Sequence, residues 1–169
     1  MNNKPKTKEI KALILEAPIG EYIGDHGAQV LAEHADCEIK IKDNDFLFHH
    51  GDLENNFYIL SSGRLVYVKE RKKKNKQPHV LQILDKGDLV AELSFIDDTP
   101  HTTSCMALGD ASVICFKADD IRPLITKEPQ LMFDFMRAVI KRVHHTVSKI
   151  SKQQMALSDY ISTGGKGRL

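Results

Sequence analysis

The stretch Gly87–Ala107, "GDLVAELSFIDDTPHTTSCMA", decides the fold. It opens with a Gly-Asp turn, continues into the short segment "ELSFI", which can form a brief helix, and ends in a β-type run. A short helix after a tight turn offers backbone N–H groups that have no partner within the helix, and such groups bind phosphate oxygens. The stretch therefore predicts a phosphate-binding cassette.

Short β-type runs surround this cassette between Cys37 and Lys117. They include "EIKIK", "NNFYIL", "RLVYVKE", "HVLQIL" and "ASVICF", and turn residues separate them at nearly regular intervals. Many short strands at such spacing indicate a barrel or jelly roll. Before the strands, apolar residues at helical spacing predict short helices, interrupted at Pro18 and at the glycines that follow it.

A long helix is predicted after the strands, and Pro129 suits its first turn. Its apolar residues recur every seven positions, which is typical of a two-stranded coiled coil. The recurring residues are Met136, Val143, Ile150 and Leu157, with Ile140 and Val147 between them. The alternative is a helix packed on its own barrel, and we expect residues 130–138 to pack in this way. Beyond Lys141 the apolar stripe narrows, which favours a homodimer.

Composition limits the classes of protein that the chain can belong to. Its 169 residues are 41% hydrophobic and 28% charged, with a formal net charge of +1, so neither disorder nor general attraction to nucleic acid is expected. The three cysteines lack metal-ligand spacing, and we predict no metal site. No apolar run is long enough to span a membrane or to form a signal peptide. We therefore expect a soluble, cytoplasmic protein without membrane contact.

Together these segments resemble the cyclic nucleotide-binding domain family, in particular the sensor domains of catabolite activator (Crp-Fnr) regulators and protein kinase A regulatory subunits. Three segments carry the resemblance: "FLFHHGDLENNFYILSSGRLVYV", the cassette with "ALGDASVICFKADDIRPLI" after it, and "PQLMFDFMRAVIKRVHHTVSKISKQQMALSDY". It implies a mainly β fold with flanking helices, a double-stranded β-helix or jelly-roll-like β-roll. The implied units are a helical segment (1–36), the β-roll (37–128), a dimerisation helix (129–160) and a flexible tail (161–169).

The resemblance also implies a set of ligand-binding residues. Glu92 stands where the family's glutamate binds the ribose 2′-hydroxyl, and His101 stands where its arginine clamps the cyclic phosphate. Thr146 stands where a threonine on the long helix contacts the purine base. The complete set is Ala91, Glu92, Leu93, His101, Thr102, Thr103 and Thr146.

Two residues depart from the family pattern. Ala91 replaces a glycine that lets the ligand approach the backbone, and His101 replaces a permanently charged arginine. Free imidazole is charged in only about a quarter of molecules at neutral pH. We expect that protonated His101 would have to hold the phosphate, so that affinity would rise as the pH falls from about 8 to 6.

Three functions remain open at this point. The first is a free-standing regulatory module that binds cyclic AMP, cyclic GMP or a related phosphate ligand and signals through its dimer helix to an unknown downstream protein. The second is a dimerisation scaffold that has lost the nucleotide, which Ala91 and His101 favour. The third is a redox or haem sensor, for which there are only scattered histidines. No residue pattern indicates an enzyme.

The basic run at residues 71–77 and the C-terminal end of the chain each support one further prediction. The basic run "RKKKNKQ", residues 71–77, reads as a solvated hairpin tip, with an acidic partner surface as the alternative. The chain ends a few residues after Tyr160, near the point where a helix-turn-helix domain begins in transcription-factor relatives. We therefore expect no direct contact with DNA.

Overall fold

The computed structural model describes residues 6–70 and 78–162. The basic run at 71–77 lies outside the described residues, as does the tail from residue 163 onward. In chain order the elements are α1 (Thr7–Glu16), α2 (Gly20–Glu33), β1 (Cys37–Ile41), β2 (Phe46–Phe48), β3 (Phe57–Ser62), β4 (Leu65–Lys69), β5 (His79–Leu84), β6 (Leu89–Val90), α3 (Glu92–Asp97), β7 (Ser104–Ala107), β8 (Ala111–Phe116), α4 (Ala118–Ile121), α5 (Leu124–Lys127) and α6 (Pro129–Ser162).

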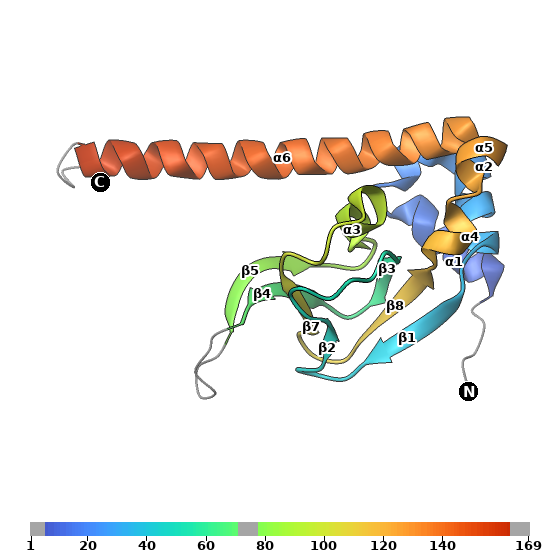
Figure 1. Ribbon diagram of the computed structural model, residues 1–169, viewed down its shortest axis with the longest axis horizontal. Helices are drawn as coiled ribbons and strands as arrows, with labels where there is room; N and C mark the ends of the chain where they lie inside the picture. Colours follow the sequence, from blue (N-terminus) through green and yellow to red (C-terminus); the bar gives the residue numbers. More distant parts are fainter. Residues whose placement is uncertain (1–5, 71–77, 163–169) are drawn as a thin grey trace.

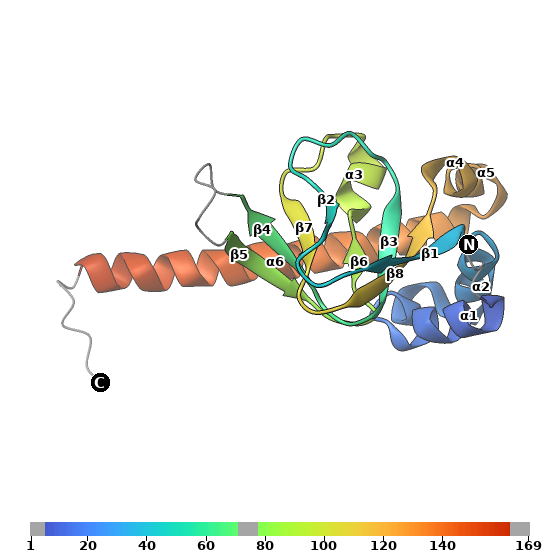
Figure 2. The same cartoon turned by 90° about the horizontal axis from the view of Figure 1, so that it is seen from below.

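The described strands form two four-stranded antiparallel sheets, which curl into a β-roll (Figure 1). One sheet has the order β1-β8-β3-β6 and the other the order β2-β7-β4-β5. Helices α1, α2, α4 and α5 gather at one end of the roll, and α6 passes over it (Figures 1 and 2). The β-roll with a long C-terminal helix, which the sequence predicted, is confirmed.

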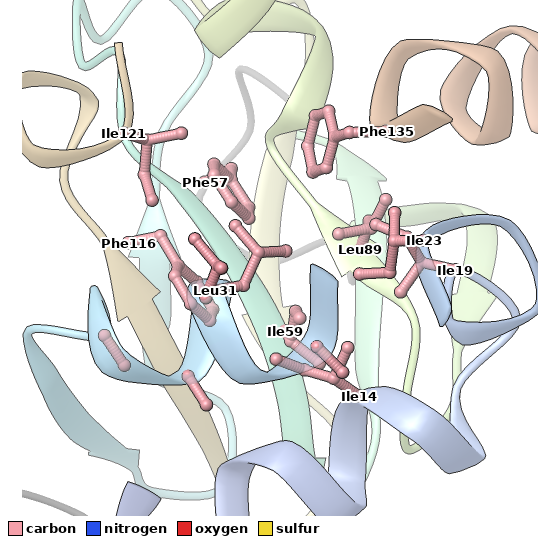
Figure 3. Packing of buried hydrophobic residues seen from close by; sticks show 14 of the residues in the cluster. Ile14, Ile19, Ile23, Leu31, Phe57, Ile59, Leu89, Phe116, Ile121 and Phe135 are labelled. Carbon is pink, nitrogen blue, oxygen red and sulfur yellow. The ribbon is translucent and has the colours of Figure 1, made fainter. Parts of the chain in front are cut away.

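The sheet that contains β3 is buried on both of its faces. Successive side chains of a strand point to opposite faces, so Phe57 and Ile59 meet the helices while Tyr58 and Leu60 point into the roll. On the helical side, Leu31 of α2 and Phe135 of α6 join the same cluster as Phe57 (Figure 3). This shared core fixes the helices against the roll.

The cassette begins at a turn that requires glycine. Gly87 has φ +91°, and its N–H donates to the carbonyl of Leu60 over 2.8 Å. A Cβ at this position would lie only 3.2 Å from the Cβ of Ala17. Helix α3 follows, and Phe95 anchors it, with its ring centroid 5.0 Å from that of Phe57 and 6.0 Å from that of Phe135. The cassette is thus fixed to both the roll and α6.

Helix α6 changes its surroundings along its length. Leu131, Met132 and Phe135 are buried against the domain, as the sequence predicted for residues 130–138, but Phe133 is 62% exposed. It points away because the packed face of a helix covers only part of its circumference. The helix continues to Ser162, so residues 161 and 162 belong to it rather than to the predicted tail. No helix within the described residues is long and apolar enough to cross a membrane.

Candidate ligand-binding site

A cavity of about 250 Å³ lies between the cassette, the inner wall of the roll and α6. All seven residues predicted from the sequence line it, although they come from positions as distant as 91 and 146. The complete lining consists of Phe48, Tyr67, Gln82, Ala91, Glu92, Leu93, Ser94, His101, Thr102, Thr103, Arg142, Val143, Thr146 and Val147.

Ala91 adopts a backbone conformation that normally favours glycine. Its φ is +63° and its ψ is +15°, in the left-handed region, and the residue is 7% exposed. The Ala91 N–H donates to the Tyr67 hydroxyl over 3.2 Å. Burial, and then the nearby Glu92 carboxylate, raise the pKa of Tyr67, so the phenol keeps its proton. The chain therefore accepts backbone strain at this point of the cassette.

Glu92, at the start of α3, forms a buried ion pair that sequence reasoning missed. The Nη1 of Arg142 on α6 lies 3.6 Å from the Glu92 carboxylate and donates to the Leu89 carbonyl over 2.6 Å. Burial raises the pKa of Glu92, and the guanidinium opposes that shift. Arg142 precedes Thr146 by four residues, so both side chains lie on one helix face. The four-residue spacing between Arg142 and Thr146 was the one signal in the sequence that could have predicted a cation in the site.

His101 is almost completely buried, at 4% exposure. Its ring stacks on Phe48, with centroids 3.8 Å apart, and its Nδ1 lies 3.0 Å from the Ser94 hydroxyl. Its Nε2 is buried without a partner among the described residues. Burial lowers the pKa of His101, and the carboxylates of Glu54 and Asp52 only partly oppose this.

The prediction that a bound phosphate would require protonated His101 stays a prediction, and the surroundings of the side chain oppose that protonation. The side chain lies inside the wall of the roll rather than in solvent, and desolvation disfavours the imidazolium. The residue type at position 101 can be read from the sequence, but the burial of its side chain cannot.

The remaining predicted residues supply polar and apolar edges to the cavity. Thr146 donates its hydroxyl hydrogen to the Arg142 carbonyl over 3.1 Å, one turn earlier in α6. Thr102 is exposed and Thr103 is half-buried, while Leu93 is 50% exposed at the rim. The cavity thus combines one ion pair, the ring of His101 and several hydroxyl groups beside an apolar helix face.

Comparison with known proteins identifies the family. The family profile described as "Cyclic nucleotide-binding domain" matches residues 38–128, more than half of the chain. The chain belongs to the cyclic nucleotide-binding domain family. The matched residues include the whole cassette and six of the seven predicted site residues, while Thr146 lies beyond them on α6.

Individual members of the cyclic nucleotide-binding domain family are distant from this chain. The "CRP-like cAMP-activated global transcriptional regulator" of Mycobacterium tuberculosis is 24% identical over 123 residues, which are 73% of this chain and 51% of the regulator. "Lysophospholipase NTE1" of Cryptococcus neoformans is 29% identical over 101 residues, 60% of this chain but only 6% of that enzyme. The chain thus spans about half the length of the regulator and a small part of the lipase.

A solved structure of the same family confirms the fold. The regulatory domain of Toxoplasma gondii PKA, co-crystallised with cAMP, superposes with a TM-score of 0.67 at 18% identity. The superposition covers 82% of this chain and 50% of that one. At this identity the likeness shows the fold alone, so the ligand of this cavity has to be argued from its own residues.

Proposed function

We propose that this chain is a regulatory module that binds a cyclic nucleotide, or a related phosphate ligand, in the cavity and signals through α6 as a homodimer. The observation that carries the proposal is the meeting of Glu92, Arg142 and the unpartnered His101 around one cavity. A cyclic nucleotide carries a ribose hydroxyl and a singly charged phosphodiester, and these three groups match that chemistry.

Arg142 supplies the fixed charge that His101 lacks. Its guanidinium stays protonated at any physiological pH, and it is already held in place by the Leu89 carbonyl. An oxyanion in the cavity would share this guanidinium with Glu92, whose carboxylate would in turn accept a ribose hydroxyl. Because Glu92 already neutralises part of the charge, we expect affinity below that of a site with an additional arginine.

The base would lie against α6. The Thr146 hydroxyl hydrogen is donated to the Arg142 carbonyl, so its oxygen remains free to accept a hydrogen bond. Adenine offers an exocyclic amino donor at the edge where guanine offers a carbonyl acceptor. Val143 and Val147 provide an apolar surface for the purine ring. This arrangement favours cyclic AMP over cyclic GMP.

A second copy of the chain would cover the outer face of α6. The apolar repeat places Ile140, Ile150 and Leu157 on this face, and they are 48–65% exposed. A helix that leaves a small domain with such a stripe needs another apolar surface to bury it. Ligand contacts at Arg142 and Thr146 would then bias the position of the dimer helix. We propose a binding role rather than a catalytic one.

The second candidate function is a scaffold that keeps the fold without binding a nucleotide. The strained Ala91, whose methyl group lies in the cassette, and the buried His101, whose pKa is lowered by desolvation, favour it. The absence of direct contact with DNA stays a prediction. The existence of a downstream protein partner also stays a prediction.

Isothermal titration calorimetry with cyclic AMP, cyclic GMP and a cyclic dinucleotide tests the proposal. We expect binding of cyclic AMP in the range from about ten micromolar to millimolar, because one of the usual cations is absent. The Glu92→Gln variant should bind more weakly, and Glu21→Gln, an exposed change on α2, should bind as the wild type does. If no ligand gives heat at millimolar concentration, the scaffold function replaces this one. An absorption spectrum of the purified protein tests the haem alternative.

A further inference from the structure

Three metal-ligating side chains meet where β1 begins and β8 ends. One ligand atom from each of Asp36, Cys37 and Cys115 lies within 4.8 Å of the other two. Within residues 6–70 and 78–162, these three form the one group of histidine, cysteine or acidic side chains gathered this closely. None of them lines the ligand cavity, so the cluster is a separate feature of the molecule.

Strand pairing holds the two thiols together. Cys37 and Cys115 are direct partners in the antiparallel register of β1 and β8, which run side by side (Figure 1). Such partners point to the same face of the sheet, and here Cys115 belongs to the apolar core inside the roll while Cys37 packs against it. The Asp36 N–H donates to the Cys115 carbonyl over 3.0 Å. The backbone therefore fixes the relative positions of all three residues.

Two thiols and a carboxylate are a suitable donor set for a thiophilic divalent cation. Sulfur ligands favour Zn²⁺ and similar ions, whereas Mg²⁺ and Ca²⁺ prefer oxygen ligands. A tetrahedral zinc site with Zn–S distances of ~2.3 Å places its sulfur atoms ~3.8 Å apart. Ligand atoms that already lie within 4.8 Å of one another need only small side-chain rotations to reach that spacing.

The surroundings of the cluster balance the charge of a bound divalent ion. Lys117 Nζ lies 3.0 Å from Asp36 Oδ1. Two thiolates and the Asp36 carboxylate carry three negative charges, which the ion and the Lys117 ammonium match. Asp36 and Cys37 are partly exposed, so an ion can enter from solvent, whereas Cys115 is 4% exposed and approaches it from inside the roll.

We propose that Asp36, Cys37 and Cys115 bind a thiophilic divalent cation such as Zn²⁺, with a water molecule as the fourth ligand, and that the bound ion clips β1 to β8. On binding, each thiol releases its proton to solvent, two metal–sulfur bonds form, and the ion exchanges water molecules for the protein ligands. The inference stands whether or not a nucleotide binds. The prediction of no metal site rested on the spacing of the cysteines along the chain, and that spacing does not register strand pairing.

Ionisable groups from several segments surround the buried thiol of Cys115. Burial raises its pKa to about 12, and acidic neighbours add to this shift, whereas the Lys117 ammonium opposes it. The acidic neighbours are Cys37, Asp36 before β1 and Glu54 in the loop before β3. Tyr58, the β3 partner of Cys115, donates its hydroxyl hydrogen to Glu54 over 2.7 Å and stays neutral because burial raises its pKa.

Metal binding should therefore release close to two protons per ion. Burial also raises the pKa of Cys37, so both thiols are protonated near neutral pH in the metal-free protein. A thiol must lose its proton before it coordinates the ion. Because two protons compete with each ion, affinity should rise roughly a hundredfold per pH unit between pH 6 and 7.5.

Titration of the reduced protein with Co²⁺ tests the site directly. Tetrahedral Co²⁺ with thiolate ligands gives intense visible bands and a thiolate-to-metal charge-transfer band in the near ultraviolet. We expect both sets of bands to saturate at one Co²⁺ per chain and to disappear when Zn²⁺ is added. Calorimetric titration with Zn²⁺ in two buffers of different ionisation enthalpy should report about two released protons. The absence of a charge-transfer band at millimolar Co²⁺ overturns the inference.

Variants locate the ligands. Removing a ligand should cost at least as much as removing an outer-shell partner, so Cys37→Ser should lose roughly a hundredfold or more in Zn²⁺ affinity. Cys115→Ala should lose the charge-transfer band, and Asp36→Asn covers the case in which Cys115→Ala does not fold. The matched control, Cys105→Ala, removes the third cysteine, which lies outside the cluster, and should bind Zn²⁺ as the wild type does. Equal Zn²⁺ affinity of Cys37→Ser and the wild type overturns the assignment.

Thermal unfolding tests the clip between β1 and β8. Saturating Zn²⁺ should raise the Tm of the wild type, because an ion that binds only the folded protein stabilises it, and should leave the Tm of Cys37→Ser unchanged. An unchanged Tm of the wild type overturns the clip. Reduced protein that binds no Zn²⁺ but forms a disulfide between Cys37 and Cys115 in air would replace the metal site with a redox pair.

Discussion

Arg142 on the long helix lies 3.6 Å from Glu92 at the start of the cassette helix. This ion pair joins the element that would carry the signal to the element that would hold the ligand. Both partners line the cavity, and neither side chain is more than one quarter exposed. A ligand that contacts either partner therefore acts on α3 and α6 together.

Arg142→Gln should weaken binding of cyclic AMP by about tenfold or more, because a hydrogen bond to a charged group contributes ~1.5–3 kcal/mol. Calorimetric titration measures this loss. Lys141→Gln is the matched control, since it removes a neighbouring charge that does not line the cavity. Equal binding by Arg142→Gln and the wild type would show that the phosphate lies elsewhere.

Glu92 should make the stability of the protein depend on pH in a defined direction. Its pKa is raised by burial above the ordinary value of 4.5. The stabilisation from this raised pKa is fully present below the pKa of the unfolded chain and is lost as the pH rises through the folded pKa. Urea unfolding should show the wild type losing stability relative to Glu92→Gln as the pH rises from about 4.5 to 7.

A difference in stability between the wild type and Glu92→Gln that is constant with pH would contradict the prediction, because it would mean that the Glu92 carboxyl group is not perturbed in the folded protein.

Restoring the family residues should strengthen nucleotide binding. His101→Arg adds a permanent charge, and Ala91→Gly removes both the methyl group and the strain of φ +63°. We expect the double variant to bind cyclic AMP at least fivefold more tightly, which corresponds to about 1 kcal/mol. Titration of both single variants and the double variant separates the two effects. No heat from the double variant at millimolar cyclic AMP would favour the scaffold function.

Charges on the outer stripe of α6 should separate the homodimer. Ile150→Glu together with Leu157→Glu places like charges in the predicted seam, away from the cavity. Light scattering should then report a monomer. The control Lys152→Glu changes the net charge by the same two units at a position outside the seam, and it should leave a dimer. A monomeric wild type at high micromolar concentration contradicts the proposed assembly. These positions avoid Val143, which packs against the core and lines the cavity.

Phe135 should matter far more to stability than its neighbour Phe133. It is completely buried between Phe57 and Phe95, and Phe135→Ala should cost ~3–5 kcal/mol. Phe133→Ala should cost much less, because that ring is 62% exposed. Urea unfolding of the two variants gives the comparison, and similar losses would mean that α6 packs through a different face.

The sequence predicted the β-roll well because its signals are local. Turn residues, short apolar runs and the change to helical spacing at Pro129 each depend on a few neighbouring residues. The candidate ligand-binding positions, in contrast, came from the resemblance to the cyclic nucleotide-binding domain family. Local patterns suffice where the chain itself determines the element.

Contacts between distant segments could not be read from spacing. Arg142 was missed because basic residues are common on α6, and its four-residue spacing to Thr146 does not indicate a contact with Glu92. Tyr67 reaches the cassette from β4 and is one of several aromatic strand residues. Cys37 lies directly opposite Cys115 in the register of β1 and β8, although 77 residues separate them in the chain. Such neighbours are set by sheet pairing, which the sequence alone does not specify.

The break between α5 and α6 gives the long helix the geometry of a lever. Glu128 leaves the helical conformation, with φ −134° and ψ 59°, and 34 residues of unbroken helix follow it. At 1.5 Å per residue the arm is about 50 Å long, so a tilt of about 5° at its base would move the far end by about 4 Å. Arg142 and Thr146 act on this arm near its middle, about 20 Å and 26 Å from its base. A displacement of about an ångström in the cavity would therefore be roughly doubled at residue 162.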